Sequence, residues 1–240
     1  MRVGGHRGSS AAAPENTYAA FERALADSAA FVETDIRRTS DGALVLMHDP
    51  TVERTTDGRG PIASLSLLEV RGLDAGAWFG DDFRGQRVPE FADFLRWIER
   101  RPAMGAALEV KSADTGAQVA EQAWSSPARE RLAIYSFSAA EIRAAKAARP
   151  QIPCVLLLEL TQDPASVIAA VDDAGADGAD VPWQWNAREL INRMRQRGMI
   201  VGGGSATGDQ AADRLLDLGV DMIDTDQPAA MLAAVQRLSP

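Results

Sequence analysis

Short apolar runs alternate with longer amphipathic stretches along the whole chain. Eight apolar runs predict strands: "RVGGH", "FVETDI", "GAALEVK", "RLAIYSF", "PCVLLLE", "GADVP", "MIVGG" and "DMIDT". Between them, apolar residues recur every three or four positions and predict helices near 15–28, 90–101, 115–127, 138–149, 164–174, 186–197, 207–218 and 227–238. Strands that alternate with helices in this way pair in parallel through crossover helices, so the pattern predicts an α/β fold.

The number of β/α units narrows the choice of fold. Eight units in 240 residues predict a closed (β/α)8 TIM barrel, with residues 1–240 forming a single domain. A doubly wound open sheet is the alternative, but "GGHRGSS" after the first strand is neither a phosphate loop nor a dinucleotide fingerprint. Residues 43–89 interrupt the alternation with a strand-like "ALVLMHD" and a turn-rich "TTDGRGPIAS". We therefore expect a small insertion after the second strand.

Two predicted strands carry charged residues at alternate positions near their carboxyl ends, Glu33 and Asp35 on one, Glu109 and Lys111 on the other. Side chains two apart share a face of a strand, and the carboxyl ends of barrel strands meet at one mouth. Three ionised carboxylates placed together require a cation, and oxygen ligands favour a hard divalent ion over zinc. The sequence thus predicts one Mg²⁺ or Ca²⁺ site formed by Glu33, Asp35 and Glu109.

The chain has only two histidines, and each directly follows an apolar run: His6 after the first predicted strand and His48 after "ALVLM". A histidine in such a position serves either a catalytic loop or a hydrogen bond that caps the strand. Two of them beside a carboxylate cluster favour catalysis. Arg7 and Lys111 are the candidate anion ligands, Arg7 through its bidentate fork and Lys111 as a point charge.

A set of motifs runs through the chain in a fixed order: "HRG", "PENT", "ETD", "TSDG…HD", "TTDGRG", "LDAGAWF", "VPEF", "LEVK", "SF" and "GVDMIDTDQP". In this order they resemble the glycerophosphodiester phosphodiesterase family, from His6 to Pro228. The resemblance implies a TIM barrel that hydrolyses glycerophosphodiesters to glycerol phosphate and an alcohol. In the family, the neighbouring glycerol hydroxyl is the nucleophile and gives a cyclic phosphate that water opens.

The resemblance also implies a role for each candidate residue. Carried over position by position, the acid/base pair is His6 and His48, the metal ligands are Glu33, Asp35 and Glu109, and the phosphate contacts are Arg7 and Lys111. The three metal-ligand carboxylates, a divalent ion, Arg7, Lys111 and a bound phosphodiester together carry no net charge.

One segment departs from the family pattern. Many members end the seventh strand with an aromatic segment, whereas residues 201–209 read "VGGGSATGD". This loop either admits a larger substituent such as a sugar, cradles a phosphate with its backbone amides, or is simply flexible. Trp183 and Trp185 in "PWQWN" offer rings that either stack on the substrate or pack beneath a loop.

Two further motifs have structural interpretations. "PENT" predicts a helix start with Pro14 and Glu15 in the first turn, and Glu15 can also support the histidine or the metal ligands. Asp224 and Asp226 near the last predicted strand are interpreted as structural loop residues, although a barrel would turn them toward the same mouth.

Composition and net charge argue against several classes of function. A formal charge of −9 argues against a nucleic-acid or membrane-surface binder, but a local positive site can still take a small phosphodiester substrate. Cys154, the single cysteine, is expected to be a buried apolar residue. The absence of a membrane-spanning run and of a signal-peptide pattern predicts a cytoplasmic protein without stable membrane association. The alternatives are the same chemistry on a sugar phosphodiester or lysophospholipid, or a non-catalytic barrel that binds a phosphorylated metabolite.

Overall fold

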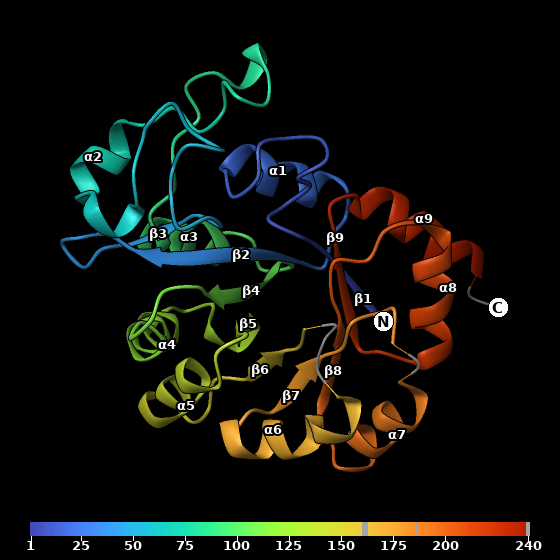
Figure 1. The fold of residues 1–240 in the computed structure, drawn as a ribbon. Helices are drawn as coiled ribbons and strands as arrows, with labels where there is room; N and C mark the ends of the chain where they lie inside the picture. Colours follow the sequence, from blue (N-terminus) through green and yellow to red (C-terminus); the bar gives the residue numbers. More distant parts are fainter. Residues whose placement is uncertain (160–162, 186, 239–240) are drawn as a thin grey trace.

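The computed structural model describes residues 1–159, 163–185 and 187–238. Eight parallel strands form its centre: β1 (Arg2–Gly5), β2 (Phe31–Arg38), β4 (Gly105–Val110), β5 (Leu132–Ser136), β6 (Cys154–Leu157), β7 (Gly178–Asp180), β8 (Ile200–Gly203) and β9 (Met222–Thr225). Strand β1 pairs with β9 on one side and with β2 on the other, through Gly4↔Phe31 and Gly5↔Val32. This pairing closes the sheet into the predicted TIM barrel (Figure 1) and excludes the open sheet.

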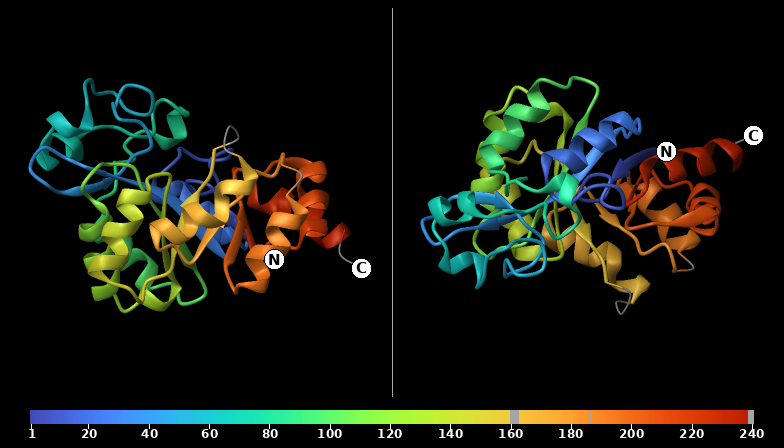
Figure 2. Two further views of the ribbon diagram at one scale, coloured as in Figure 1. Left: turned by 60° about the horizontal axis from the view of Figure 1, so that its bottom comes forward. Right: turned by 90° about the horizontal axis from the view of Figure 1, so that it is seen from above.

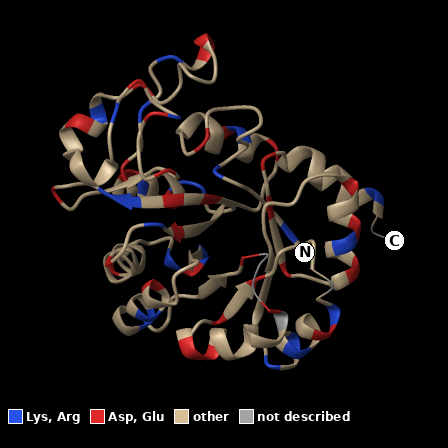
Figure 3. Ribbon diagram, in the orientation of Figure 1, with Lys and Arg blue, Asp and Glu red and all other residues tan. Residues whose placement is uncertain are grey.

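Each parallel strand leads into helical structure that covers the outside of the barrel (Figure 1). The helices are α1 (Tyr18–Ala26), α3 (Phe91–Glu99), α4 (Gly116–Ser125), α5 (Ala139–Ala148), α6 (Val167–Ala174), α7 (Arg188–Gln196), α8 (Gly208–Leu218) and α9 (Pro228–Leu238), with 3-10 turns η3 (Arg129–Arg131) and η4 (Pro164–Ser166). All eight lie within the predicted ranges, although residue 186, the predicted start of one, lies outside the described residues. Acidic and basic residues are interspersed along these helices (Figure 3).

The main apolar core lies between the strands and the surrounding helices. Phe21 of α1 packs against Phe94 of α3 at 5.1 Å between ring centroids, and Trp97 stacks on Phe94 at 5.9 Å. Fully burying one such side chain stabilises the fold by about 2–3 kcal/mol. Cys154 is fully buried in the same core, and burial raises the pKa of its thiol to about 12. The interpretation of Cys154 as a small apolar residue is confirmed.

The first helix begins later than the sequence predicted. Thr17 is the N-cap of α1, and its hydroxyl accepts a hydrogen bond from the backbone N–H of Ala20. Pro14 and Glu15 precede this cap, so the prediction that they lie in the first turn is wrong. Asn16 has a φ of 55°, which turns the chain sharply before the helix and sends its amide into the barrel mouth. The four-residue motif thus serves the site as well as the helix.

The segment after β2 builds a small structure of its own. It contains β3 (Leu44–Leu46), which pairs antiparallel with β2, followed by η1 (Ile62–Ser64), α2 (Leu67–Gly72) and η2 (Asp81–Phe83). A separate apolar cluster holds it together, formed by Val45, Met47, Val52, Ile62, Val70, Ala75 and Val88. Figure 2 shows the segment standing out on one side of the barrel. The strand-like "ALVLMHD" is therefore a strand, at the edge of the barrel rather than in it.

The barrel interior contains little apolar bulk. Phe31, Ala107, Tyr135 and Val155 form a small inner cluster. A Cβ on Gly4 would lie 2.3 Å from the Phe31 ring, so only glycine fits there. Tyr135 lines both the cavity at the mouth and a smaller one at the opposite end, and it therefore separates the two. No helix in the described part of the chain is long and apolar enough to cross a bilayer.

Candidate active site

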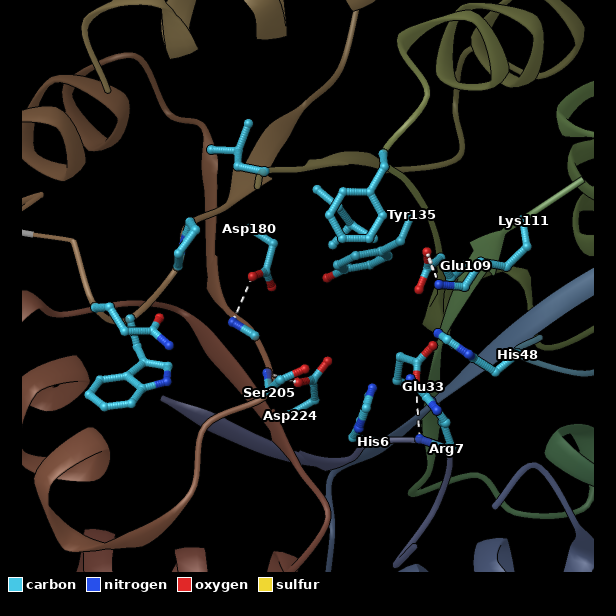
Figure 4. A pocket seen from close by; sticks show the side chains of 17 residues that line it. His6, Arg7, Glu33, His48, Glu109, Lys111, Tyr135, Asp180, Ser205 and Asp224 are labelled. Atoms are coloured by element: carbon cyan, nitrogen blue, oxygen red, sulfur yellow. Dashed lines mark hydrogen bonds and ion pairs between the residues drawn. The ribbon is translucent and has the colours of Figure 1, made fainter. Parts of the chain in front are cut away.

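A cavity of about 300 Å³ opens at the carboxyl ends of the barrel strands (Figure 4). His6 and Arg7, directly after β1, line one part of it together with Glu33, Glu109 and His48. These residues come from β1, β2, β4 and the loop after β3, and their side chains converge because parallel barrel strands end at one mouth. The structure thus brings the sequence-predicted candidates into one place.

Three of the candidates form a buried carboxylate triad. Glu33, Asp35 and Glu109 each offer one oxygen, and the three oxygens lie within 4.8 Å of one another. The register of the sheet explains this placement, because Asp35 on β2 pairs directly with Glu109 on β4. The three residues are only 4%, 1% and 6% exposed, respectively.

The donor set of this triad suits a hard cation. Glu33 Oε1 and Asp35 Oδ1 are buried and accept no hydrogen bond from the described residues, and Glu109 Oε1 is contacted by the Lys111 ammonium. Burial and the neighbouring Asp35 charge raise the pKa of Glu33 well above its usual range and that of Glu109 to about 7. Buried carboxyl groups with such perturbed pKa values are stabilised in their ionised form when a divalent ion binds them.

Two basic residues flank the triad. Lys111 Nζ lies 2.7 Å from Glu109 Oε1 and 3.3 Å from Asp35 Oδ1. Arg7 Nε lies 3.3 Å from Asp35 Oδ2, and the Arg7 backbone N–H donates to Glu33 Oε2 at 2.8 Å. Although burial opposes ionisation of Asp35, these two cations outweigh it and lower its pKa. Arg7 and Lys111 therefore lie where an anion bound to a cation in the triad would meet them.

Each histidine is paired with a carboxylate through Nδ1, which leaves Nε2 for a substrate. His6 Nδ1 lies 2.7 Å from Asp226 Oδ1, and His48 Nδ1 lies 2.7 Å from Asp49 Oδ1. Ser10 donates to the same Asp226 oxygen at 2.7 Å. Such a carboxylate fixes the ring orientation and the tautomer of a histidine. Asp226, interpreted from the sequence as a structural residue that a barrel would turn toward the mouth, thus positions His6.

The two rings differ in their electrostatic environment. Burial opposes protonation of His6, but Asp226, Glu33 and Asp224 outweigh it and raise its pKa to about 9. Half-buried His48 has a lowered pKa, because burial outweighs the attraction of Asp35 and Asp49. The site thus holds one histidine that favours the protonated form and one that favours the neutral form.

An ion network connects Arg7 with His48 behind the cavity. The Glu15 carboxylate accepts from Arg7 Nη1 at 2.9 Å and from Arg54 Nη1 and Nη2 at 2.7 and 2.8 Å. Arg54 in turn forms an ion pair with Asp49, the partner of His48. Glu15 therefore supports the site, as one of its two sequence interpretations proposed, whereas the participation of Arg54 was missed.

The far side of the cavity carries residues that the sequence interpretation missed or undervalued. Asp180 and Asp224 line it, across from Glu109 and Lys111, and Tyr135 lies between the two sides (Figure 4). Asp180 and Asp224 lie in the apolar runs that became β7 and β9, so the strand-end rule that found Glu33 would also have found them. Asp224 lies on β9 and lines the cavity, and its carboxylate also binds the Ser205 N–H of the loop after β8, as expected of a structural residue that faces the mouth.

The glycine-rich loop after β8 is packed around these two carboxylates. Gly204 N–H donates to Asp180 Oδ1 at 2.6 Å, and the Ser205 N–H donates to Asp224 Oδ1. A Cβ on Gly202 would lie 2.4 Å from Asp180 Oδ2, so the carboxylate occupies the space that a side chain would need. Because the Gly204 and Ser205 amides already bind carboxylates, they do not support the alternative in which this loop cradles a phosphate.

The aromatic residues that the sequence placed near the site divide between the cavity and the core. Trp183 lines the cavity, whereas Trp185 is 9% exposed and packs in the main core. Residue 186 of the same motif lies outside the described residues. Phe137 is half exposed at the rim, with Lys111 Nζ 5.7 Å from its ring centroid.

The fold and the cavity define the class of the protein: a TIM-barrel enzyme with its site at the carboxyl ends of the strands. Its family follows from comparison with known proteins. The model of the glycerophosphoryl diester phosphodiesterase family matches residues 6–230, and the chain belongs to this family. It is thereby a phosphoric diester hydrolase, as the sequence motifs predicted.

Individual relatives agree with this assignment. The chain is 30% identical over 239 residues to a glycerophosphodiester phosphodiesterase of Caldanaerobacter subterraneus, covering 97% of this chain and 96% of the relative. It resembles the crystal structure of a glycerophosphodiester phosphodiesterase from Agrobacterium tumefaciens (27% identity, TM-score 0.84, covering 97% and 99% of the two chains). It also resembles an Oleispira antarctica phosphodiesterase in complex with the product sn-glycerol-3-phosphate (26% identity, TM-score 0.90, covering 98% and 97%).

Proposed function

We propose that the protein hydrolyses a small glycerophosphodiester to glycerol phosphate and an alcohol, using one divalent cation, Mg²⁺ or Ca²⁺. The observation that carries the proposal is the buried triad of Glu33, Asp35 and Glu109. Its Glu33 Oε1 and Asp35 Oδ1 accept no hydrogen bond from the described residues, and two cationic side chains lie beside it. The product-bound relative from Oleispira antarctica supports the choice of substrate class.

The triad would hold the cation through one oxygen of each carboxylate. When bound, this ion neutralises charge on the phosphoryl oxygens and acidifies a nearby hydroxyl. The Arg7 guanidinium and the Lys111 ammonium, already at the rim of the triad, bind the remaining phosphate oxygens and orient the ester. This arrangement holds one phosphodiester at the centre of the cavity.

The two histidines divide the proton transfers. Neutral His48 accepts a proton at Nε2 from the attacking glycerol hydroxyl, and protonated His6 donates a proton from Nε2 to the leaving alkoxide. The opposite shifts in their pKa values support this division. Water then opens the resulting cyclic phosphate with the two roles exchanged. Asp226 and Asp49 hold both rings in the required tautomer.

Alanine variants at the two histidines test the catalytic roles. Loss of a general acid or base lowers turnover by about 10²–10⁴-fold, and we expect this of both His6→Ala and His48→Ala while circular dichroism shows an unchanged fold. Near wild-type turnover in both variants would contradict the proposal.

Calorimetric titration with Mg²⁺ and Ca²⁺ tests the cation site without any substrate. We expect Glu109→Gln to weaken binding of the ion, because it replaces one charged ligand of the triad. Glu130→Gln, at a side chain that is 80% exposed, is the matched control and should bind the ion like the wild type. Equal binding by both variants would contradict the assignment of the triad.

A further inference from the structure

The side chain of Arg37, near the end of β2, holds the backbone of His48. Its Nε and Nη2 both donate to the His48 carbonyl oxygen, at 2.8 and 2.6 Å. The pairing of β2 with β3 ends one residue before His48, at the hydrogen bond from the Met47 N–H to the Asp35 carbonyl oxygen. The chain then bends away at residues 48–50. Arg37 therefore continues the attachment of this segment to the barrel beyond the point where the strands part.

This contact fixes the peptide that joins His48 to its own carboxylate partner. A carbonyl oxygen and the two flanking Cα atoms lie in one plane, so the plane held by Arg37 carries His48 at one end and Asp49 at the other. Asp49 Oδ1 is the atom that lies 2.7 Å from His48 Nδ1. Because the guanidinium is a rigid fork, two of its donors on one oxygen restrict the rotation of that plane. Arg37 thus constrains both the ring and the group that sets its tautomer.

The other histidine is attached to the barrel without such a side chain. The His6 backbone N–H donates to the Thr225 carbonyl oxygen of β9 at 2.9 Å, and Asp226, which binds the His6 ring, is the next residue. His6 and its partner therefore both follow directly on paired barrel strands. His48 and Asp49 lie instead on the insertion, whose apolar cluster is separate from the main core. The position of His48 relative to the barrel thus needs a contact of its own.

The contacts of Arg37 point to no role besides this one. Its described side-chain contacts are the two hydrogen bonds to His48, and neither is an ion pair with a carboxylate. Burial lowers the pKa of Arg37 more than the nearby carboxylates raise it. The residue is not among those that line the cavity, whereas Arg7 and Lys111 are. A partly buried cation is costly unless its donors are used, and here they are used on the His48 carbonyl.

We propose that Arg37 is a positioning residue that holds the His48 ring in the cavity for proton transfer. The ring points into the cavity (Figure 4), and a catalytic group has to be held within about 0.5 Å of its productive position. This inference rests on the proposed function, because the proposed proton transfer gives His48 its catalytic role. Loss of Arg37 leaves Arg7 and Lys111 in place, so it acts on the proton transfer and not on the binding of the phosphodiester.

Relaxation of the histidine rings tests the contact without any substrate. The chain has only two histidines, so ¹³C labelling of histidine Cε1 gives one NMR signal for each. We expect the His48 ring to be rigid in the wild type and mobile on the nanosecond scale in Arg37→Met, and the His6 ring to be rigid in both. Arg87→Met is the matched control, because the Arg87 guanidinium also donates to two backbone carbonyls of the insertion, at 2.8 and 3.1 Å, and its loss should leave the His48 ring rigid.

Steady-state kinetics then measure the consequence for the reaction. A displacement of a catalytic group by about 1 Å costs about 10²-fold in rate, so we expect Arg37→Met to lower kcat by about this factor with KM unchanged. Arg87→Met should keep the wild-type kcat. Arg37→Lys keeps one donor for the His48 carbonyl but not the fork, so its kcat should lie between those of the wild type and Arg37→Met. Circular dichroism establishes that each variant is folded, and if Arg37→Met is not, the comparison is made with Arg37→Lys.

Each outcome decides the question. A rigid His48 ring in the folded variant would overturn the positioning role, and so would a wild-type kcat. A loss that lies in KM alone would also overturn it, because it would assign Arg37 to substrate binding. If the His48 ring becomes mobile but the wild-type protein hydrolyses no glycerophosphodiester, Arg37 does hold the ring and the proposed activity fails.

Discussion

Glu15 is the centre of the ion network behind the cavity, and the Glu15→Gln variant removes its charge with little change of shape. Its carboxylate binds Arg7 on the cavity side and Arg54 on the side of the insertion. Glutamine keeps one acceptor oxygen but turns an amide N–H₂ toward a guanidinium that has only donors. Because Glu15 Oε1 accepts from both arginines, a glutamine oxygen in its place keeps one neutral hydrogen bond to each, but the charge is lost from both pairs and Arg54 Nη1 then faces an N–H₂ donor.

The expected loss of stability follows from the burial of each pair. Glu15 is 11% and Arg7 17% exposed, so the hydrogen bond between them contributes close to the full value for a charged pair, about 2 kcal/mol. Arg54 is 44% exposed and keeps its ion pair with Asp49, so solvent screening reduces its share to about 1 kcal/mol. Loss of the charge from both pairs therefore costs at most about 3 kcal/mol, which lowers the Tm of a chain of this size by up to about 6–12 °C.

The stabilisation that the Glu15 charge gives to the folded protein depends on pH. Burial raises the pKa of Glu15, but Arg54 and Arg7 outweigh it, and the pKa in the folded protein lies below its ordinary value of 4.5. A lowered pKa means that the ionised form stabilises the folded state. This contribution is fully present above pH 4.5 and is lost as the pH falls through the folded-state pKa. The stability difference between wild type and variant should shrink accordingly in acid.

Urea and thermal unfolding of both proteins, followed by circular dichroism across this pH range, measure the difference. The Glu130→Gln variant is the control, because the pair of Glu130 with Arg129 is largely exposed and should contribute less than about 1 kcal/mol. A Glu15→Gln variant as stable as this control at neutral pH would refute the network. So would a stability difference that stays constant in acid.

Two further substitutions test other contacts of the structure. The Asp226→Asn variant should lower the pKa of His6 from about 9 toward 6.5, as followed by NMR titration of the ring. Because this pKa is raised in the folded state, the contribution of the pair to stability is complete below pH 6.5 and is lost as the pH rises through about 9; a variant with an unchanged His6 pKa would contradict the pairing. The Glu141→Gln variant should destabilise the fold by about 2–3 kcal/mol, because its buried carboxylate accepts the backbone N–H groups of Asp114, Thr115 and Gly116 at the start of α4. A melting temperature within 2 °C of the wild type, on the scale of about 2–4 °C per kcal/mol for a chain of this size, would contradict that role.

The periodicity of the chain was sufficient to predict the fold. Each parallel strand and its covering helix were visible as local patterns, because a barrel repeats one unit whose apolar faces are dictated by neighbouring residues. The triad was predictable for the same reason. Glu33 and Asp35 share a face of β2, and the strand-end rule alone placed Glu109 beside them.

The contacts that tune the site were not predictable from local patterns. Asp226 reaches His6 across 220 positions of the chain, and Arg54 reaches Glu15 across 39. Such pairs depend on how loops of unknown shape pack over the mouth. The position of the first helix cap depended on a similar detail, since Asn16 takes a positive φ to reach Asp35 and moves the cap to Thr17.

The central claim is tested most directly by product release after metal removal. A glycerophosphodiester is incubated with protein stripped by a chelator, and glycerol phosphate is measured before and after Mg²⁺ or Ca²⁺ is restored, alongside the Glu109→Gln variant. The account predicts that turnover disappears with the chelator, returns with the ion, and stays low in the variant at the same ion concentration. Full turnover by the chelator-treated protein, or by Glu109→Gln, would contradict it.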